Sequence, residues 1–192
     1  MPITDQAALE FLMTRRSRPA KMLAPPVPTR SELEPILRAA LRSPDHGKLE
    51  PWRLIILERA ALARLADLVT ARGGSLGRDE NDTVKARAQF NDSHLAVAVI
   101  EVQKPSDKVP PIEQSYSAGA VCLGLLNAAL ASGWGANWLS GWPAHDRGFV
   151  DSGLGLAGHE RVVGFVHIGT ARAEPPERPR PDTESTVTWV SE

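Results

Sequence analysis

The chain has 192 residues, of which 42% are hydrophobic and 23% are charged, and its formal net charge at pH 7 is −1. These values are typical of a folded single domain and argue against a disordered chain. Because nucleic-acid affinity rests on Lys and Arg contacts to phosphates, a near-neutral chain without a long basic run is not expected to bind nucleic acid.

The single cysteine, Cys122, excludes an internal disulfide and a thiolate cage for zinc. The five histidines show no metal-binding spacing, so we expect no metal site. The first 17 residues lack the apolar core of a signal peptide, and no apolar run approaches the roughly 18 residues of a membrane span. We therefore expect a cytoplasmic protein with no membrane partner.

The N-terminal segment predicts a helix over residues 5–16, because Leu9, Leu12 and Met13 recur at three- and four-residue spacing. The proline-rich stretch 24–30, APPVPTR, should then run as an extended linker, since proline fixes φ and removes a donor.

A second helix should begin at Thr29 or Ser31 and end near Arg42. Ser31 and Glu34 have the spacing of a capping box, in which each residue bonds the other's backbone amide. Proline is tolerated only near a helix start, so Pro35 favours the boundary at Ser31.

The middle of the chain predicts two strands and two helices separated by a glycine-rich loop over 72–81. The run RLIILE is short and apolar, as expected of a buried strand. The elements are a strand over 53–58, helices over 59–72 and 79–93, and a strand over 94–103.

The longest helical candidate, residues 113–132, is apolar or small on almost every face from Ala118 to Ala131. Such a helix must be buried on all sides. A partner subunit that covers one side explains this pattern, and a central helix inside a monomer is the alternative.

The remaining chain predicts a strand and turn over 133–142, a short helix over 143–152, a strand over 160–170 and a proline-rich tail ending in the strand-like TVTWV. The tail has little tendency to pack on its own core and is expected to extend across a partner. The predicted fold class is α+β, with a central mixed sheet of about four to five strands flanked by helices.

Gly153, Gly155 and Gly158 match the dinucleotide fingerprint by letter. The fingerprint needs a strand before it and a helix after it, whereas here a helix precedes it and a strand follows. We therefore interpret the segment as a glycine-rich connection.

Polar groups gather at the ends of several predicted elements. Arg15, Arg16 and Ser17 follow the first helix, Arg42 and His46 follow the second, and Ser140 follows a later strand. Arginine supplies bidentate donors for a phosphate, and Trp52 and Trp138 offer flat apolar walls. Together these residues suit an anion attached to a planar ring.

These motifs identify a family resemblance through their order and spacing. RRS after the first helix, RSPDHGKLEPW about twenty-five residues later, NWLSG after the long apolar helix, and VVGFVHIGT before a proline-rich tail resemble the short members of the nitroreductase family. The resemblance extends over residues 5–190.

The resemblance implies one FMN-binding domain over residues 1–192 that uses NADH or NADPH. It also implies a homodimer that exchanges its termini, with the tail over about 173–192 lying on the partner and FMN at the interface. Two electrons would pass through flavin N5 to a nitroaromatic, quinone or similar acceptor, with ping-pong kinetics. Because solvent can supply protons, no catalytic side chain is named.

The resemblance also assigns cofactor-binding residues. At the end of the first helix, the phosphate and ribityl chain should be contacted by Arg15, Arg16 and Ser17, and past the last strand a further phosphate contact should come from Arg172. FMN should be contacted across the interface by Arg42 and His46, and from a later strand by Trp138, Leu139 and Ser140. The nicotinamide should be contacted by the end of the long helix, which comprises Ala128, Ala129, Leu130, Ala131, Ser132 and Gly133.

Three points stay open on the sequence. Leu139 stands where short members commonly have Arg and Glu50 where much of the family has Gln, so a flavin-binding protein without turnover is one alternative. A flavin enzyme with a narrower substrate, such as an enone, is another. The polar turn around His46 either reaches toward a flavin or is a loop in which Asp45 bonds its own backbone.

Overall fold

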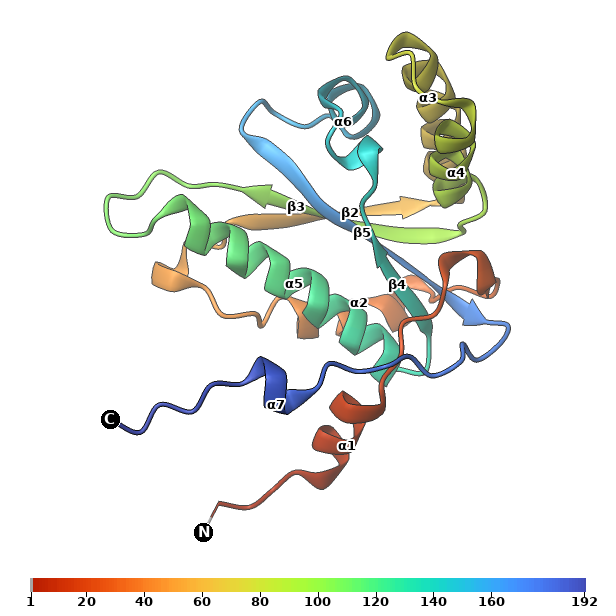
Figure 1. The fold of residues 1–192 in the computed structure, drawn as a ribbon. Coiled ribbons are helices and arrows are strands. Elements are labelled where there is room, and N and C mark those ends of the chain that lie inside the picture. Colours follow the sequence, from red (N-terminus) through yellow and green to blue (C-terminus); the bar gives the residue numbers. More distant parts are fainter. Residues whose placement is uncertain (1) are drawn as a thin grey trace.

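One antiparallel sheet of five strands organises the computed structural model, which describes residues 2–192 (Figure 1). The strand order is β1-β5-β3-β2, and β4 pairs with the other side of β5. The predicted α+β class is confirmed, but the expectation of a mixed sheet is wrong, because every pair is antiparallel. The strands are β1 Leu23–Ala24, β2 Trp52–Glu58, β3 Leu95–Val102, β4 Gly135–Leu139 and β5 Glu160–Ala171.

Helices cover both faces of this sheet. One core lies under α3, α4 and α6, and the other under α2 and α5. The α-helices are α1 Gln6–Thr14, α2 Arg30–Ala40, α3 Arg59–Ser75, α4 Glu80–Asn91, α5 Pro111–Ala131, α6 Arg147–Leu154 and α7 Thr183–Thr186. The short 3-10 helices are η1 Ala20–Met22, η2 His46–Lys48 and η3 Trp142–Ala144.

β5 is the central element, since it pairs with β1, β3 and β4. Its register against β3 shifts between Val99, opposite Gly164, and Ile100, opposite Val162, so Val163 is the extra residue of a bulge. A bulge increases the local twist of a strand. Residues 165–167 of β5 pair with β3 on one side and β4 on the other, and β1 pairs with residues 170–171 at its C-terminal end.

Helix α2 begins differently from the prediction. Its N-cap is Thr29, which forms the capping box with Glu32, and not Ser31 with Glu34. Glu34 instead pairs with Arg38 at 2.8 Å, one turn along the helix. Pro35 lies inside the helix, so the boundary that it favoured is wrong.

Three other expectations need correction. β2 is an edge strand, and only Leu57 in it is fully buried, so RLIILE is not a buried strand. α6 begins at Arg147, because Asp146 caps it by accepting from the amide of Phe149. The segment TVTWV forms no strand within residues 2–192, while its expected place on a partner stays a prediction.

The long helix α5 is not covered on all sides within one chain. Tyr116 is 68% exposed and Leu123 is 47% exposed, and Ile112 lies on the same stripe. The alternative of a helix fully enclosed in a monomer is therefore wrong for this stripe. None of the helices over residues 2–192 has the length and apolar character needed to cross a bilayer.

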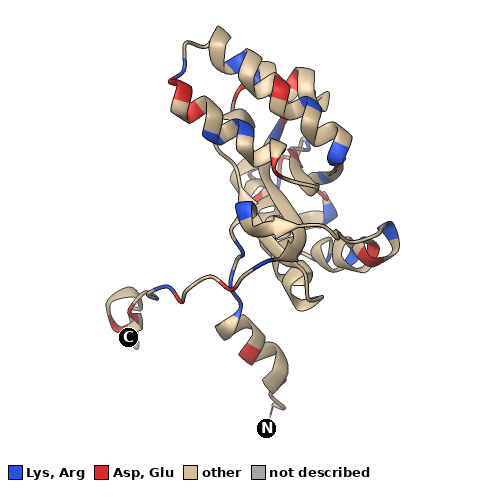
Figure 2. Ribbon diagram, turned by 90° about the vertical axis from the view of Figure 1, so that its right-hand side faces the viewer, with Lys and Arg blue, Asp and Glu red and all other residues tan. Residues whose placement is uncertain are grey.

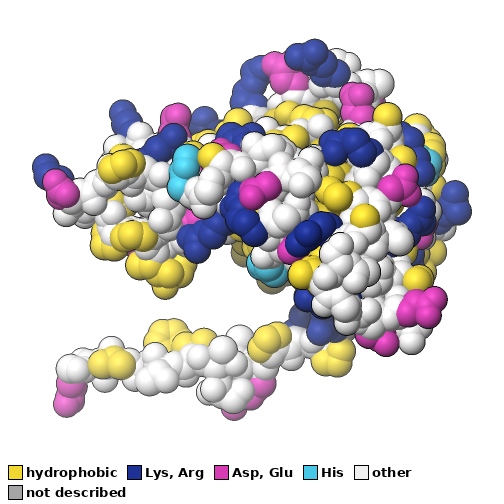
Figure 3. Space-filling view, turned by 90° about the horizontal axis from the view of Figure 1, so that it is seen from above, with side chains coloured by type: hydrophobic (Ala, Val, Ile, Leu, Met, Phe, Trp, Pro, Cys, Tyr) yellow, Lys and Arg dark blue, Asp and Glu magenta, His cyan; other side chains and the backbone are white. Residues whose placement is uncertain are grey.

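Both ends of the chain stand away from the body (Figure 1). α1 has no buried residue, so the apolar side chains of Leu9, Leu12 and Met13 are exposed. The C-terminal tail forms an arm with hydrophobic side chains, and Trp189 in it is 91% exposed (Figure 3). Exposed apolar surface of this kind marks an interaction site.

Candidate functional site

The segment that follows α1 runs beside the sheet. The helix ends at Arg15, whose backbone is extended and whose amide donates to the Phe11 carbonyl. Three residues later, the Arg18 amide donates to the Ala136 carbonyl of β4 at 2.8 Å. The predicted RRS motif is thereby held next to the strand that carries Trp138 and Leu139.

A hollow of about 600 Å³ lies where this segment meets the end of α5 and the start of the tail. It brings together two predicted groups, the arginines after α1 and the end of the apolar helix. Basic residues lie where α1 and the tail join the body (Figure 2). The main lining residues are Arg15, Arg16, Arg18, Leu130, Gly133, Trp134, Glu174 and Glu177. We call this the arginine hollow.

The arginine hollow has positive charge that the protein does not fully neutralise. Arg15 donates to Ser17 Oγ at 2.9 Å, but the buried Nε atoms of Arg15 and Arg16 have no partner within residues 2–192. Burial lowers the pKa of Arg15, and the nearby charges of Arg180 and Arg16 lower it further. An anion in this hollow would relieve that repulsion.

The tail supplies carboxylates at the rim of the hollow. Glu174 lies 3.3 Å from Arg18, and Glu177 lies 3.9 Å from Arg16. Arg16 also donates to the Pro176 carbonyl at 2.9 Å. Within residues 2–192, no carboxylate oxygen lies within 4.0 Å of the Arg15 guanidinium. Arg15 is therefore the most available guanidinium for a ligand.

A second hollow of about 320 Å³ continues along the same segment, between α4 and β4. Its lining includes Lys21, Lys85, Gln89, Asn137 and Leu139. Gln89 Nε2 is buried without a partner, and neither lysine forms an ion pair within the described chain. We call this the lysine hollow. Asp92 also lines it, so its charged lining is two lysines and one carboxylate.

Sequence reasoning missed Lys21, Lys85 and Gln89. In the sequence Lys85 and Gln89 resemble the solvated face of a helix, and their spacing of four residues shows only that they share a face. Nothing local indicates that this face looks onto β4. A pattern of that kind is visible only once the fold is known.

The later predicted residues lie on alternating sides of β4. Trp138 packs onto Gly164 of β5, where an added Cβ would overlap its indole Nε1. Leu139 points the other way and lines the lysine hollow, not the arginine hollow. A leucine at this position therefore removes no charge from the arginine hollow.

The turn around His46 is held by its own contacts. Asp45 accepts from the Glu50 amide at 2.6 Å, as the simpler interpretation of this turn expected. His46 Nδ1 lies 2.6 Å from Glu113 on α5. Lys48 and Glu50 adopt positive φ angles of 54° and 45°, which is uncommon for residues with a side chain and concentrates at functional sites.

The single chain does not bring this turn to the arginine hollow. His46 lines a separate hollow of about 450 Å³ with Tyr116 and Ser117, beside the exposed stripe of α5. Arg42 follows α2 and is exposed. The indole Nε1 of Trp52 donates a hydrogen bond to Ser117 Oγ at 3.1 Å. A contact from Arg42 or His46 to a shared ligand requires a second copy.

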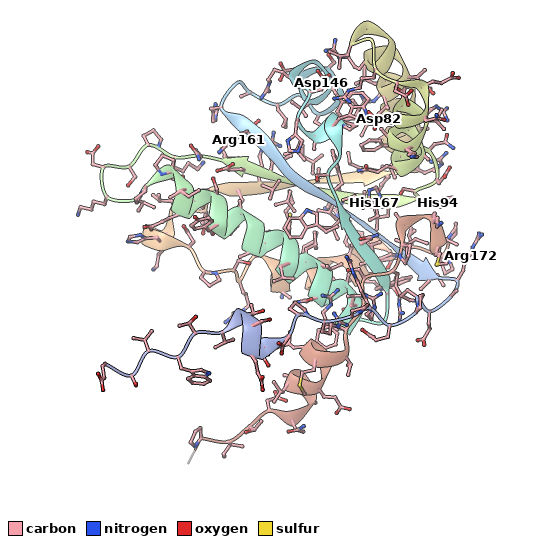
Figure 4. All side chains as sticks on the ribbon, in the orientation of Figure 1. Asp82, His94, Asp146, Arg161, His167 and Arg172 are labelled. Carbon is pink, nitrogen blue, oxygen red and sulfur yellow. The ribbon has the colours of Figure 1, made fainter. Side chains whose placement is uncertain are left out.

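Arg172 lies at the far tip of β5 (Figure 4). Its side chain is exposed and does not line the arginine hollow, whereas its neighbours Ala171 and Glu174 do. The charge that faces Arg15 from the tail belongs to Arg180, which the sequence had not singled out.

The other candidate groups have structural roles. Burial raises the pKa of the Cys122 thiol to about 12, so it is a packed thiol and not a nucleophile. Gly155 ends α6 in the left-handed conformation, as a glycine-rich connection requires. Within residues 2–192, no three His, Cys, Asp or Glu side chains are arranged to hold a metal ion.

Comparison with known proteins gives consistent matches. Residues 12–170 match the model of the nitroreductase family. A candidate NAD(P)H nitroreductase of Haemophilus influenzae is 36% identical over 185 residues, covering 95% of this chain and 99% of that protein.

Two solved structures share the fold. A nitroreductase-like family protein from Bacillus cereus has a TM-score of 0.77 and 20% identity over 99% of both chains. A variant of NfnB from sphigopyxis sp. strain HMH, described as an FMN- and NADPH-dependent nitroreductase, has a TM-score of 0.73 and 18% identity, covering 95% of this chain and 98% of that one. At these identities the two structures support the fold alone.

Proposed function

The chain belongs to the nitroreductase family, and we propose that it is an FMN-dependent oxidoreductase that takes electrons from NADH or NADPH. The observation that carries the proposal is the pair of adjoining hollows along residues 15–21. The arginine hollow suits a phosphate, and the lysine hollow beside β4 suits the polar edge of a flat ring.

The phosphate end fits the residues present. Arg15 and Arg16 have buried Nε atoms without a hydrogen-bond partner within residues 2–192, and Arg180, which pairs with Glu177 at 2.8 Å, adds a third positive charge nearby. A phosphate monoester accepts several charge-assisted hydrogen bonds, which are stronger than bonds between neutral groups. We assign the phosphate to Arg15, Arg16 and Arg180 and a ribityl contact to Ser17.

The ring end also fits. Lys21 and Lys85 bring positive charge to the lysine hollow, and the unpaired amide of Gln89 supplies a neutral donor. Bound FMN would accept two electrons from NAD(P)H and pass them to an acceptor such as a nitroaromatic or a quinone. The lysines would stabilise the negative charge of the reduced ring, and the backbone of residues 138–140 would support it.

We propose that the working form is a homodimer of one-domain subunits. A second copy would cover the exposed stripe of α5, the exposed apolar face of α1 and Trp189 of the tail. In that arrangement Arg42 and His46 would reach the flavin of the partner. The tail from about residue 173 would extend onto the neighbouring subunit.

The experiment is an absorption spectrum of the purified protein before and after addition of FMN, followed by NADH and NADPH oxidation with nitroaromatic, quinone and enone acceptors. We expect a flavin spectrum and turnover with nitroaromatics or quinones. The double variant Arg15→Ala/Arg16→Ala should bind FMN poorly while remaining folded.

The other readings predict different results. Bound flavin with no turnover would mean a storage or regulatory protein, and turnover with enones alone would mean a narrower enzyme. A protein that stays colourless after FMN addition would contradict the proposal.

A further inference from the structure

A buried histidine links the sheet to the lysine hollow. His167 lies in β5 with no exposed surface, opposite Asn137 of β4 and Ala96 of β3 (Figure 4). Its Nδ1 lies 2.7 Å from Ser93 Oγ. Ser93 lines the lysine hollow, so the histidine lies one residue behind that site.

The hydrogen-bond partners determine the tautomer of His167. Ser93 Oγ donates its one proton to the Gln89 carbonyl at 2.9 Å. It must therefore accept from His167, which carries its proton on Nδ1. His167 Nε2 then carries only a lone pair, and it has no hydrogen-bond partner within residues 2–192.

This link fixes the end of α4. The Gln89 carbonyl belongs to the last turn of α4, and Ser93 follows the C-cap residue Asp92. Lys85 lies one turn before Gln89 on the same face, and both line the lysine hollow. The position of His167 in the sheet is thereby transmitted through Ser93 to the helix face that carries the two donors.

We propose that His167 is a positioning residue, which acts through Ser93 to hold Lys85 and Gln89 of α4 against the flavin ring. This inference rests on the proposed function. The chain from His167 Nδ1 to Ser93 Oγ to the Gln89 carbonyl carries it. If α4 moves, the donors no longer stabilise the reduced ring as well as before, and the two-electron reduction potential of the bound flavin falls.

The test compares two substitutions at one site. His167→Asn keeps a donor near the Nδ1 position but leaves unfilled volume, whereas His167→Leu fills the volume and has no donor. In His167→Leu we expect the affinity for reduced FMN, relative to the affinity for oxidised FMN, to be about tenfold lower than in the wild type. This change lowers the reduction potential by about 30 mV for a two-electron couple. His167→Asn should keep the potential near that of the wild type, although it lowers the melting temperature.

Ser93→Ala provides a second variant that removes the link without touching the sheet. It should shift the potential as His167→Leu does, and the double variant should shift it no further, because both break the same chain of contacts. Equal potentials in the wild type, His167→Leu and Ser93→Ala would overturn the proposal. A shift that followed the melting temperature across all variants would also overturn it, since that is the signature of a merely structural role.

Hydrogen exchange in protein free of FMN tests the positioning separately from the proposed function. The backbone amides of Gln89 and Phe90 should exchange about tenfold faster in His167→Leu and Ser93→Ala than in the wild type. Unchanged exchange would overturn the positioning role. A protein that failed to bind FMN but showed faster exchange would refute the flavin assignment while leaving the His167–Ser93 link to α4 intact.

Discussion

Replacing Gly164 by alanine should destabilise the protein through Trp138. A Cβ built at Gly164 would overlap the indole nitrogen of Trp138 and lie 2.5 Å from its Cδ1 atom. Real carbon atoms do not approach so closely, so either the indole leaves its place or β4 moves away from β5. Both strands are paired at this point, where Trp138 lies opposite Val166.

The expected cost follows from the cheaper of these two responses. Complete removal of a buried Trp side chain costs about 3–5 kcal/mol, and Trp138 is only half-buried. A shift of the strand costs about 1–3 kcal/mol, as overpacked cores do. We therefore expect Gly164→Ala to lower the free energy of unfolding by about 1–3 kcal/mol, which is roughly 2–12 °C in melting temperature for a chain of this length.

Thermal and urea unfolding measure this directly, with Gly158→Ala as the matched control. Gly158 has no atom within 4 Å of an added Cβ, so its substitution should change stability by less than about 0.5 kcal/mol. In a Trp138→Ala background the extra cost of Gly164→Ala should disappear. Equal stability of the two glycine variants would refute the steric argument.

Arg15→Ala should weaken FMN binding by about 1.5–3 kcal/mol in a fluorescence titration, whereas substitution of the exposed Arg30, Arg30→Ala, should not. Equal FMN affinities of Arg15→Ala and the wild type would remove Arg15 from the phosphate site. Leu123→Glu should convert the proposed dimer to a monomer in analytical ultracentrifugation, whereas Val84→Glu, at an exposed position of α4, should not; a Leu123→Glu dimer would contradict the α5 interface. Burial lowers the pKa of His167 to about 4, whereas the pKa in the unfolded chain is about 6.5. As the pH falls, the unfolded state therefore binds the proton first, and the free energy of unfolding should fall by up to about 3 kcal/mol between about pH 6.5 and pH 4. Urea unfolding of the wild type and His167→Asn across that range should show a shallower loss in the variant, and parallel curves would contradict the assignment.

Local sequence signals located most elements because they act over a few residues. The apolar run over 94–103 predicted a strand, and β3 spans Leu95–Val102. The capping box of α2 was misplaced by two residues because Thr29 with Glu32 and Ser31 with Glu34 have the same spacing. Pro35 shows that tertiary packing of Leu33 and Ile36 outweighs the lost helix hydrogen bond.

The candidate site was only partly visible in the sequence, because it is assembled across the fold. The arginines after α1 stood out as a cluster of charges at a helix end. Lys85 and Arg180 did not, since one depends on how α4 faces β4 and the other on how the tail turns back. Contacts of this kind depend on tertiary geometry, which no local spacing encodes.

In the proposed dimer, the two ends of the tail would have different tasks, and the tail would couple cofactor binding to self-association thermodynamically. Glu174 and Glu177 form one wall of the arginine hollow, while Trp189 lies exposed more than ten residues further on. With Trp189 docked on a second subunit, the wall is anchored, and cofactor affinity and self-association each strengthen the other by the same factor. Dilution alone would then release flavin, and adding flavin would lower the concentration at which the subunits separate.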